Sequence, residues 1–125
     1  MEGLIRWEYD GFSVLRADYS LVEDPLQLLH AIMREQYSAE GDCCYSLIDF
    51  GYRTFSENFI REYRELAIDL ASKKKLYAAY LGLPQENYED AKRILANIDG
   101  KATIAFFEAE PAAIKWLLSF KGCVD

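Results

Sequence analysis

The chain has 125 residues, enough for one domain that buries a core of its own. Its 21 Asp and Glu residues outnumber its 14 Lys and Arg residues, so the formal net charge is −7. A surface that binds nucleic acid needs clustered Lys and Arg to replace the counterions of the phosphates. The charge balance therefore argues against nucleic acid as a partner.

The sequence predicts a cytoplasmic protein without membrane insertion. No apolar run approaches the roughly 20 residues that a membrane helix needs. The first ten residues, MEGLIRWEYD, carry acids where a signal peptide would carry basic residues. The three cysteines, Cys43, Cys44 and Cys123, are an odd number, and two are adjacent, which is poor geometry for a disulfide. No C-x-x-C or His-rich spacing indicates a zinc site or any other metal site.

The first segments predict a hairpin followed by a helix. Residues 4–9 and 12–19 are rich in strand-forming residues, and the Asp-Gly pair between them is typical of a type I′ turn. Asp24 and Pro25 are the residue types preferred at an N-cap and at the first helical position. We therefore expect a helix to begin at this pair.

The central stretch, residues 45–70, predicts a buried strand that leads into an amphipathic helix. Residues 45–50 form a short apolar run of the kind that is buried on both faces. Thr54 and Glu57 have the T-x-x-E spacing of a capping box, and the apolar residues after them recur at helical spacing. Because open α/β sheets carry their sites at the carboxyl ends of strands, the loop between strand and helix is the expected site.

Two more strand–helix units follow. Residues 76–81 and 102–107 are continuous apolar runs, typical of buried parallel strands. Between them, Asn87 should cap a helix that ends at Asp99-Gly100. Pro111, preceded by Glu110, should open the last helix.

The predicted order of elements is β-β-α-β-α-β-α-β-α. Because strand–helix–strand crossovers are right-handed, the repeated pattern predicts that the later strands are parallel to one another. The hairpin adds an antiparallel strand at the edge of the sheet. We therefore predict an α/β fold in which a five-stranded mixed sheet packs against four helices on one or both faces. No linker or repeat interrupts the pattern, so residues 1–125 should form a single domain.

Two stretches carry a family resemblance. LIDFGYRTFSENFIREY, residues 47–63, is similar to a strand that ends in Asp and leads through a short loop to a helix with R-x-Y. FFEAEPAAIKWL, residues 106–117, is similar to a closing phenylalanine strand and an A-[LI]-x-W-L helix, matched by Ala113, Ile114, Trp116 and Leu117. With the order of elements, the chain resembles the STAS fold, named for sulphate transporters and anti-sigma-factor antagonists. The nearest resemblance is to small stand-alone bacterial STAS-like proteins of unassigned function, and it covers nearly the whole chain.

The resemblance also raises the question of a phosphorylation switch. In the antagonist branch, a partner kinase phosphorylates a serine at the start of the central helix, and the added charge blocks docking. This sequence departs from that branch, because the usual D-S-S-G stretch falls on residues 56–59, with Asn58 and Phe59 at the acceptor positions. Thr54 and Ser56 remain candidate phosphoacceptors, although capping of the helix would explain both.

We expect a non-enzymatic protein-interaction or regulatory domain that docks a protein partner through the loop and helix start after the central strand. The candidate partner-binding residues all lie in this stretch: Asp49, Gly51, Arg53, Thr54, Ser56, Glu57 and Asn58. A structural role is the alternative for two of them, because Asp49 and Glu57 could simply stabilise the loop and the helix N-terminus.

The alternative function is binding of a small hydrophobic, lipid-like ligand. The chain has 9 Tyr, 7 Phe and 2 Trp residues. Such rings could line a cavity between the sheet and a helix, or they could simply fill the core.

No motif indicates an enzyme or a cofactor. The sequence contains no G-x-S-x-G, P-loop, G-x-G-x-x-G or H-E-x-x-H motif. His30 has no second histidine or cysteine near it in sequence, and nothing basic adjoins Cys43-Cys44 to activate a thiol. We therefore assign no catalytic residue.

The hairpin edge suggests self-association. Residues 4–9 could pair with a second copy of the chain unless Arg6 and Glu8 block the approach. A homodimer, or a monomer in equilibrium with it, is therefore an expectation.

Overall fold

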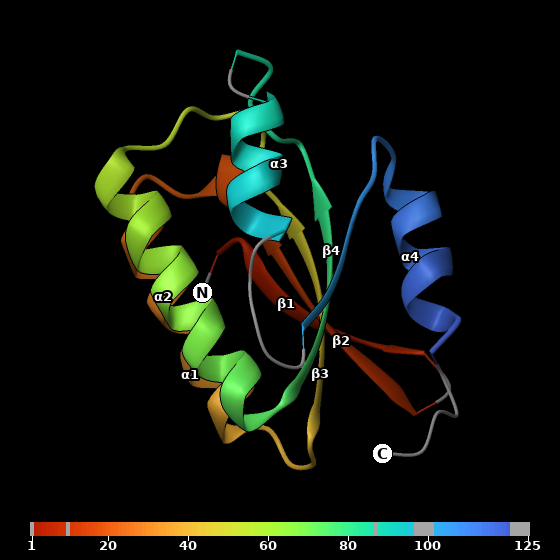
Figure 1. Cartoon of the computed structure of the whole chain (residues 1–125). Helices are drawn as coiled ribbons and strands as arrows, with labels where there is room; N and C mark the ends of the chain where they lie inside the picture. Colours follow the sequence, from red (N-terminus) through yellow and green to blue (C-terminus); the bar gives the residue numbers. More distant parts are fainter. Residues whose placement is uncertain (1, 10, 87, 97–101, 121–125) are drawn as a thin grey trace.

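The strands of the sheet lie side by side in the order in which they occur in the chain. The computed structural model describes residues 2–9, 11–86, 88–96 and 102–120. The strands are β1 (Leu4–Tyr9), β2 (Phe12–Asp18), β3 (Cys43–Asp49), β4 (Lys75–Leu81) and β5 (Ala102–Phe106), in the order β1-β2-β3-β4-β5. β1 is antiparallel to β2 and the other pairs are parallel, so the predicted five-stranded mixed sheet is confirmed (Figure 1).

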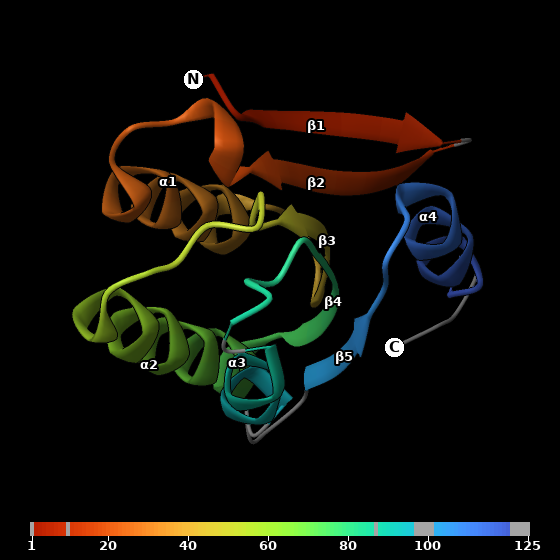
Figure 2. The same cartoon turned by 90° about the horizontal axis from the view of Figure 1, so that it is seen from above.

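Three helices cover one face of the sheet and a fourth covers part of the other (Figure 2). They are α1 (Pro25–Ser38), α2 (Glu57–Lys73), α3 (Tyr88–Ala96) and α4 (Glu110–Leu118), and a short 3-10 helix, η1 (Tyr19–Leu21), follows β2. Because the sheet grows in one direction and each crossover is right-handed, α1, α2 and α3 fall on the same face. α4 follows the last described strand, β5, and packs on the opposite face.

The alternation of side chains along the strands divides the core into two layers. The larger cluster lies under α1, α2 and α3 and includes Ala17, Ile48 and Tyr80. The smaller cluster lies under α4 and consists of six buried residues: Val14, Leu47, Ala79, Leu81, Ala113 and Leu117. The central strands are therefore buried on both faces, as the continuous apolar runs predicted.

Helix α1 begins as predicted. The carboxylate of Asp24 accepts a hydrogen bond from the Leu26 N–H at 3.1 Å, and Pro25 is the first helical residue. The capping residue fits the rule that an N-cap oxygen satisfies a free amide of the first turn.

The predicted capping box of α2 is wrong. Ser56, not Thr54, is the N-cap, and its Oγ accepts a hydrogen bond from the Phe59 N–H at 3.1 Å. The physical reason is that Ser56 has the extended backbone of an N-cap residue, with φ −67° and ψ 158°, while the Phe55 ring stacks on the Phe59 ring at 4.5 Å across this start of the helix. Glu57 becomes the first helical residue, where the helix dipole favours its negative charge.

Of the predicted ends of the later elements, some fall on residues that the structure describes and others do not. Helix α4 begins at Glu110 as predicted. The turn residue Asp10, the predicted cap Asn87 and the predicted helix end Asp99-Gly100 lie outside the described residues, as does Cys123.

None of the helices within the described ranges has both the length and the apolar composition needed to cross a bilayer.

Candidate interaction surface

The loop after β3 is fixed to β4 by the backbone. The Phe50 N–H donates to the Leu81 carbonyl at 2.9 Å, and the Tyr52 N–H donates to the Gly82 carbonyl at 2.7 Å. Gly82 has to be a glycine here, because a Cβ at this position would lie 2.5 Å from Asp49 Oδ1. The loop therefore continues the β3–β4 pairing past the ends of the strands.

Asp49 and Gly51 form the turn that starts this loop. Asp49 Oδ1 accepts a hydrogen bond from the Gly51 N–H at 2.8 Å, and Gly51 has a φ of 65°. A Cβ on Gly51 would lie 2.8 Å from the Ser20 Cβ, so the absence of a side chain lets η1 approach the loop. Both residues, predicted to contact a partner, therefore have a structural role in the loop.

Arg53 ties the loop to η1. Its Nη1 donates to the carbonyls of Tyr19 at 2.6 Å and Val22 at 2.7 Å, and its Nη2 donates to the Glu23 carbonyl at 3.4 Å. The guanidinium also lies 5.7 Å from the centre of the Phe55 ring. The Arg53 N–H donors, which we expected to contact a partner, therefore hold together two segments of this chain that are more than 30 residues apart in sequence.

The loop also exposes Tyr52, an aromatic residue that was not among the predicted site residues. Tyr52 has a φ of 58°, the one described non-glycine residue with a positive φ, and 62% of it is exposed. Leu21, on η1, is also outside the core and is 52% exposed. Gly51 and Ser20, which precede Tyr52 and Leu21 in the sequence, approach each other closely. The only sequence signal for Tyr52 was a large aromatic residue in a short polar loop, directly after a glycine.

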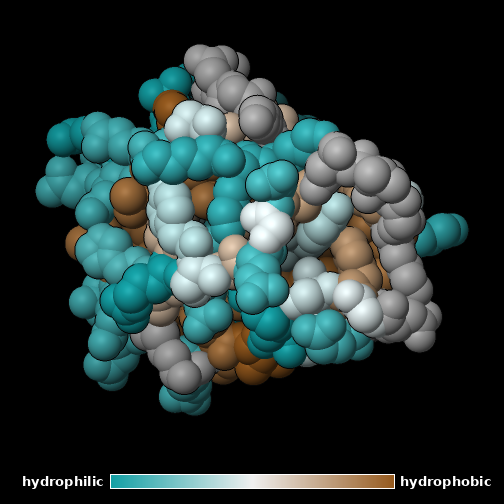
Figure 3. Space-filling view, turned by 90° about the horizontal axis from the view of Figure 1, so that it is seen from below, coloured by the Kyte–Doolittle hydropathy of each residue, from teal (hydrophilic) through white to brown (hydrophobic). Residues whose placement is uncertain are grey.

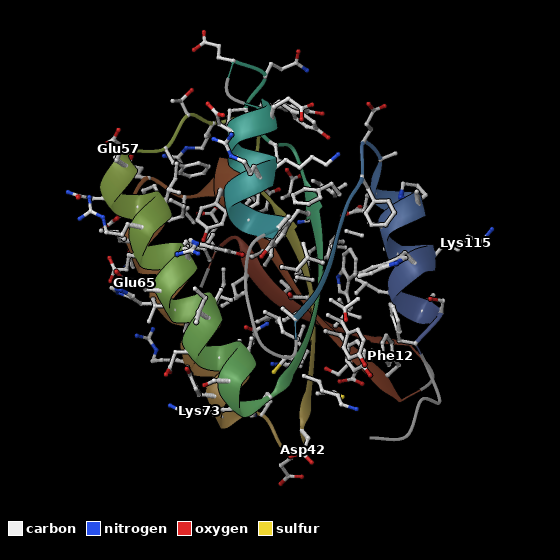
Figure 4. The ribbon with its side chains drawn as sticks, in the orientation of Figure 1. Phe12, Asp42, Glu57, Glu65, Lys73 and Lys115 are labelled. Carbon is white, nitrogen blue, oxygen red and sulfur yellow. The ribbon has the colours of Figure 1, made fainter. Side chains whose placement is uncertain are left out.

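The remaining predicted residues lie at the start of α2. Thr54, Ser56, Glu57 and Asn58 are all exposed, and the Ser56 hydroxyl also caps the helix. Figure 4 shows Glu57 at the end of α2 that lies beside the loops. The structure thus separates the predicted set, because Asp49 lies on the strand face toward α4 whereas Thr54 and Glu57 border the opposite layer.

A second feature of this end of the molecule is a groove of about 300 Å³ between the first turns of α2 and α3, which we call the α2–α3 groove. Aromatic and aliphatic side chains line most of it, and Thr54, Glu57 and Asp90 are its polar lining residues. The other lining residues are Phe50, Phe55, Phe59, Ile60, Tyr63, Leu83, Pro84, Ala91 and Leu95.

Three tyrosine hydroxyls are buried behind this groove. Tyr63 donates a hydrogen bond to the Tyr80 oxygen at 3.0 Å, whereas the Tyr19 hydroxyl has no partner among the described residues. Burial raises the pKa of Tyr80 to about 12 and also raises the pKa values of Tyr19 and Tyr63. All three are therefore neutral phenols near pH 7, which does not suit them to act as bases.

The other reactive side chains lie away from this surface. His30 pairs with Glu62 at 2.9 Å between α1 and α2. The expectation that nothing basic adjoins the cysteines holds in sequence but is wrong in space, since the charges of Lys74 and Arg6 act on Cys44. Burial outweighs them and raises the pKa of the Cys44 thiol. Across the described ranges, no group of three or more His, Cys, Asp or Glu residues could hold a metal ion.

The opposite end of the molecule has a second cavity, and its lining is more polar than that of the α2–α3 groove. Seen from below, at the amino ends of β2 to β5, hydrophilic residues alternate with smaller apolar groups (Figure 3). A cavity of about 630 Å³ at the amino ends of β2 and β3 is bordered by charged residues, among them Arg6, Glu8 and Glu35. Arg6 and Glu35 form an ion pair with each other at 3.4 Å, so their charges are already paired within the protein.

No protein-family model, curated protein or solved structure matches the chain significantly. The resemblance to STAS-like proteins therefore stays a prediction, and the loop and the α2–α3 groove are the basis for assigning a function.

Proposed function

We propose that this chain is a non-enzymatic, STAS-like regulatory domain of the bacterial cytoplasm that docks a protein partner through the loop after β3. The observation that carries the proposal is Tyr52. A non-glycine residue in the left-handed region costs about 1 kcal/mol or more, and such residues gather at functional sites. Here the strained residue is also a large aromatic side chain that is 62% exposed. Exposed tyrosines of this kind are frequent anchors of protein interfaces.

The rigidity of the loop supports the same function. Backbone hydrogen bonds to β4 and the Arg53 guanidinium hold the loop and η1 before any partner arrives. A preformed surface loses less conformational entropy on binding. Asp49, Gly51 and Arg53 would then support the surface, while Thr54, Glu57 and Asn58 would form its polar rim beside Tyr52.

A phosphorylation switch on this surface would favour Thr54 over Ser56. The Ser56 oxygen is engaged by the Phe59 N–H, whereas Thr54 is exposed in the loop and is not the cap. A phosphate on Thr54 would add negative charge next to Glu57, on the surface proposed for docking.

The test is capture of a partner from source-cell lysate by wild-type protein and by three variants. Tyr52→Gly removes the ring and relieves the positive φ, so this variant should fold at least as stably as wild type. Tyr52→Phe keeps the ring. Tyr37→Ala removes an exposed tyrosine on α1 and is the matched control. We expect wild type, Tyr52→Phe and Tyr37→Ala to hold the same partner and Tyr52→Gly to lose at least tenfold of it; equal capture by Tyr52→Gly would refute docking through this loop.

The second candidate function, binding of a small hydrophobic ligand, is favoured by the α2–α3 groove. Four aromatic rings line it, and its volume of about 300 Å³ is at the lower end of ligand cavities. Native mass spectrometry of the purified protein would test it, since a carried molecule adds a mass that denaturation removes.

Self-association through β1 remains a proposal. β1 is an edge strand, and its Ile5 is 51% exposed. An exposed edge can pair with a second copy, although Arg6 and Glu8 in the same strand oppose a close approach. A strict monomer in light scattering at high concentration would end this idea.

A further inference from the structure

The outer edge of β1 is open to a second chain. Figure 2 shows β1 as the outermost strand of the sheet, with β2 on its inner side and no other described element beyond it. The Asp18 N–H donates to the Gly3 carbonyl at 2.7 Å, which marks a hydrogen-bonded pair of the β1–β2 ladder. Because hydrogen-bonded and non-hydrogen-bonded pairs alternate along an antiparallel ladder, the odd-numbered residues of β1 bond to β2. The backbone N–H and C=O groups of Leu4, Arg6 and Glu8 therefore point outward, away from β2.

The two faces of β1 carry different side chains. Trp7 and Ile5 share the face on which α4 lies, since Trp7 is opposite Val14 of the core under that helix. Ile5 is 51% exposed, and Trp7 is half-buried. Arg6 and Glu8 are exposed on the other face, the one covered by α1. The edge thus has an apolar strip on one face and two opposite charges on the other.

Both charges can take a partner from outside the chain. Glu8 forms no ion pair with any other described residue. The Arg6 guanidinium contacts Glu35 at 3.4 Å and Ser13 at 3.0 Å, which uses two of its five N–H donors. The Arg6 side chain also remains 35% exposed. Arg6 can therefore keep its contacts within the chain and donate to a further carboxylate.

The charges distinguish the possible registers of a second β1 strand. Two copies related by a two-fold axis pair antiparallel, and a pairing centred on Trp7 brings Arg6 of each copy opposite Glu8 of the other. A pairing centred on Arg6 would bring two guanidinium groups together, and one centred on Glu8 would bring two carboxylates together. A pairing centred on Ile5 would set Arg6 opposite Leu4, without a charge partner. Of these four registers, the Trp7-centred one alone is complementary in charge.

The Trp7-centred register also fits the backbone and the apolar strip. The outward-facing N–H and C=O groups of Arg6 meet those of Glu8 in the other copy, as hydrogen-bonded pairs. Trp7 then forms a non-hydrogen-bonded pair with Trp7 of the other copy at the axis, where opposing side chains lie closest. Each Ile5 is diagonal to that ring and within its reach. The exposed apolar side chains are therefore covered in the same register that pairs the charges.

We propose that two copies of this chain associate through β1 in the Trp7-centred register, so that their two sheets become one continuous sheet. This inference rests on the self-association proposed above and specifies its geometry. The two Trp7 rings and the two Ile5 side chains form the apolar centre on one face, and two Arg6–Glu8 pairs flank the axis on the other. The edge charges, which oppose other registers, thereby select this one.

Mixing two charge variants tests the register. Glu8→Arg leaves only basic charges on the outward-facing residues, and Arg6→Glu leaves only acidic ones. Each variant alone should associate about tenfold more weakly than wild type, or weaker still, because like charges face each other at two positions. An equimolar mixture should recover the wild-type affinity, since every charge across the axis again meets its opposite. Sedimentation equilibrium at about 0.15 M salt, where the general repulsion of acidic chains is screened, measures these dissociation constants.

The mixture separates the register from other effects of the substitutions. Recovery uses the same two proteins that fail to associate alone, so a folding defect in either one cannot produce it. Each substitution changes the net charge of −7 by two, so both chains stay acidic and have no general attraction for each other. Arg61→Glu makes the same change of charge at an exposed position of α2, and this matched control should associate as wild type does.

Disulfide trapping measures the register directly. The background is Cys43→Ser/Cys44→Ala/Cys123→Ser, which removes the native thiols and should itself give no covalent dimer. In this background, Trp7→Cys should form a covalent dimer with oxidised glutathione, because Cα atoms of a non-hydrogen-bonded pair lie about 4.5 Å apart. Ile5→Cys should not, since the two copies of residue 5 are offset by four positions, about 14 Å along the strands.

The outcomes distinguish the register from the self-association on which it rests. A wild-type chain that stays monomeric at millimolar concentration would overturn both. A dimer whose charge variants fail to recover on mixing would overturn the register and leave self-association standing. Trapping by Ile5→Cys in place of Trp7→Cys would have the same meaning, because it requires a pairing centred on Ile5.

Discussion

The two faces of the sheet are built in different ways. The face under α1, α2 and α3 has a large contiguous core, rich in aromatic rings, and includes three buried tyrosine hydroxyls. The face under α4 has a core of six buried residues, and Glu110, the first residue of α4, pairs with Arg16 of β2 at 2.6 Å. Beyond that core, the rings of Phe12, Tyr45, Tyr77 and Phe120 follow one another across the strands at 4.4 to 4.9 Å.

This difference explains why the loop after β3 and the α2–α3 groove both adjoin the layer formed by α1, α2 and α3. α3 has 9 residues and α2 has 17, so α3 covers less of the sheet and leaves a groove against the first turns of α2. The loop after β3 joins the same layer through Phe50 and Phe55, which pack on Tyr19. On the other face, one helix covers the centre of the sheet, and its first residue is anchored by an ion pair.

The largest expected effect comes from deleting a core side chain on each face. Leu70 on α2 and Leu117 on α4 are both buried, with 0% and 1% exposure. Leu70→Ala should lower the free energy of unfolding by about 4 kcal/mol, because the large core cannot close the cavity. Leu117→Ala should cost about 2–3 kcal/mol, since a short final helix can shift to fill part of the space.

Urea unfolding followed by circular dichroism measures this difference. Equal losses for the two variants would show that both faces are packed equally tightly and would remove the distinction between them.

A smaller effect tests the unpartnered hydroxyl of the three-helix face. Tyr19→Phe removes a buried oxygen that has no partner among the described residues, so the free energy of unfolding should rise by about 1 kcal/mol at pH 7. Tyr80→Phe is the matched control, because it removes the acceptor of the Tyr63 hydroxyl and should lower stability by a similar amount.

Alkaline pH provides a second measure of the same site. Burial raises the pKa of Tyr19 above its usual value, so the folded state keeps a proton that the unfolded state loses above about pH 10. Titration of this group therefore leaves the free energy of unfolding unchanged below that pH and lowers it as the pH rises further. Tyr19→Phe should therefore lose less stability than wild type between pH 10 and 11. An identical decline in both proteins would contradict the buried position of the hydroxyl.

The smallest expected effect concerns the ion pair that anchors α4. Arg16 and Glu110 keep 18% and 36% of their side chains exposed, so water and salt screen much of their attraction. Glu110→Gln should cost about 0.5 kcal/mol at low salt and less at high salt. Glu108→Gln, a change of an exposed acid two residues earlier, is the control and should be neutral. A loss above about 2 kcal/mol would show that the pair behaves as a buried one.

Much of the fold could be predicted from local patterns. Apolar runs at residues 45–50 and 76–81 marked strands, and Asp24-Pro25 marked the start of α1. These features depend on residues adjacent in the chain, so their sequence carries the signal. The start of α2 could not be predicted in this way, because Thr54 and Ser56 are both competent caps and the local sequence does not distinguish them.

That the site lies in the loop after the central strand stays a prediction, made from the rule for open α/β sheets. In the structure, Arg53 is engaged by three backbone carbonyls from the η1 segment, and Tyr52, which was not among the predicted residues, is 62% exposed. Contacts between distant segments leave no mark in the local pattern of either one.

The sequence by itself determined the order of the elements and hence the mixed sheet, because periodicity, turn residues and the handedness of crossovers act locally along the chain. Only the tertiary structure decided which polar groups are used internally and where space remains. The α2–α3 groove joins residues 50–63 to residues 83–95, and its volume depends on how far α3 stands from α2. No spacing in the sequence encodes that separation, since it results from the packing of all the side chains between the two helices.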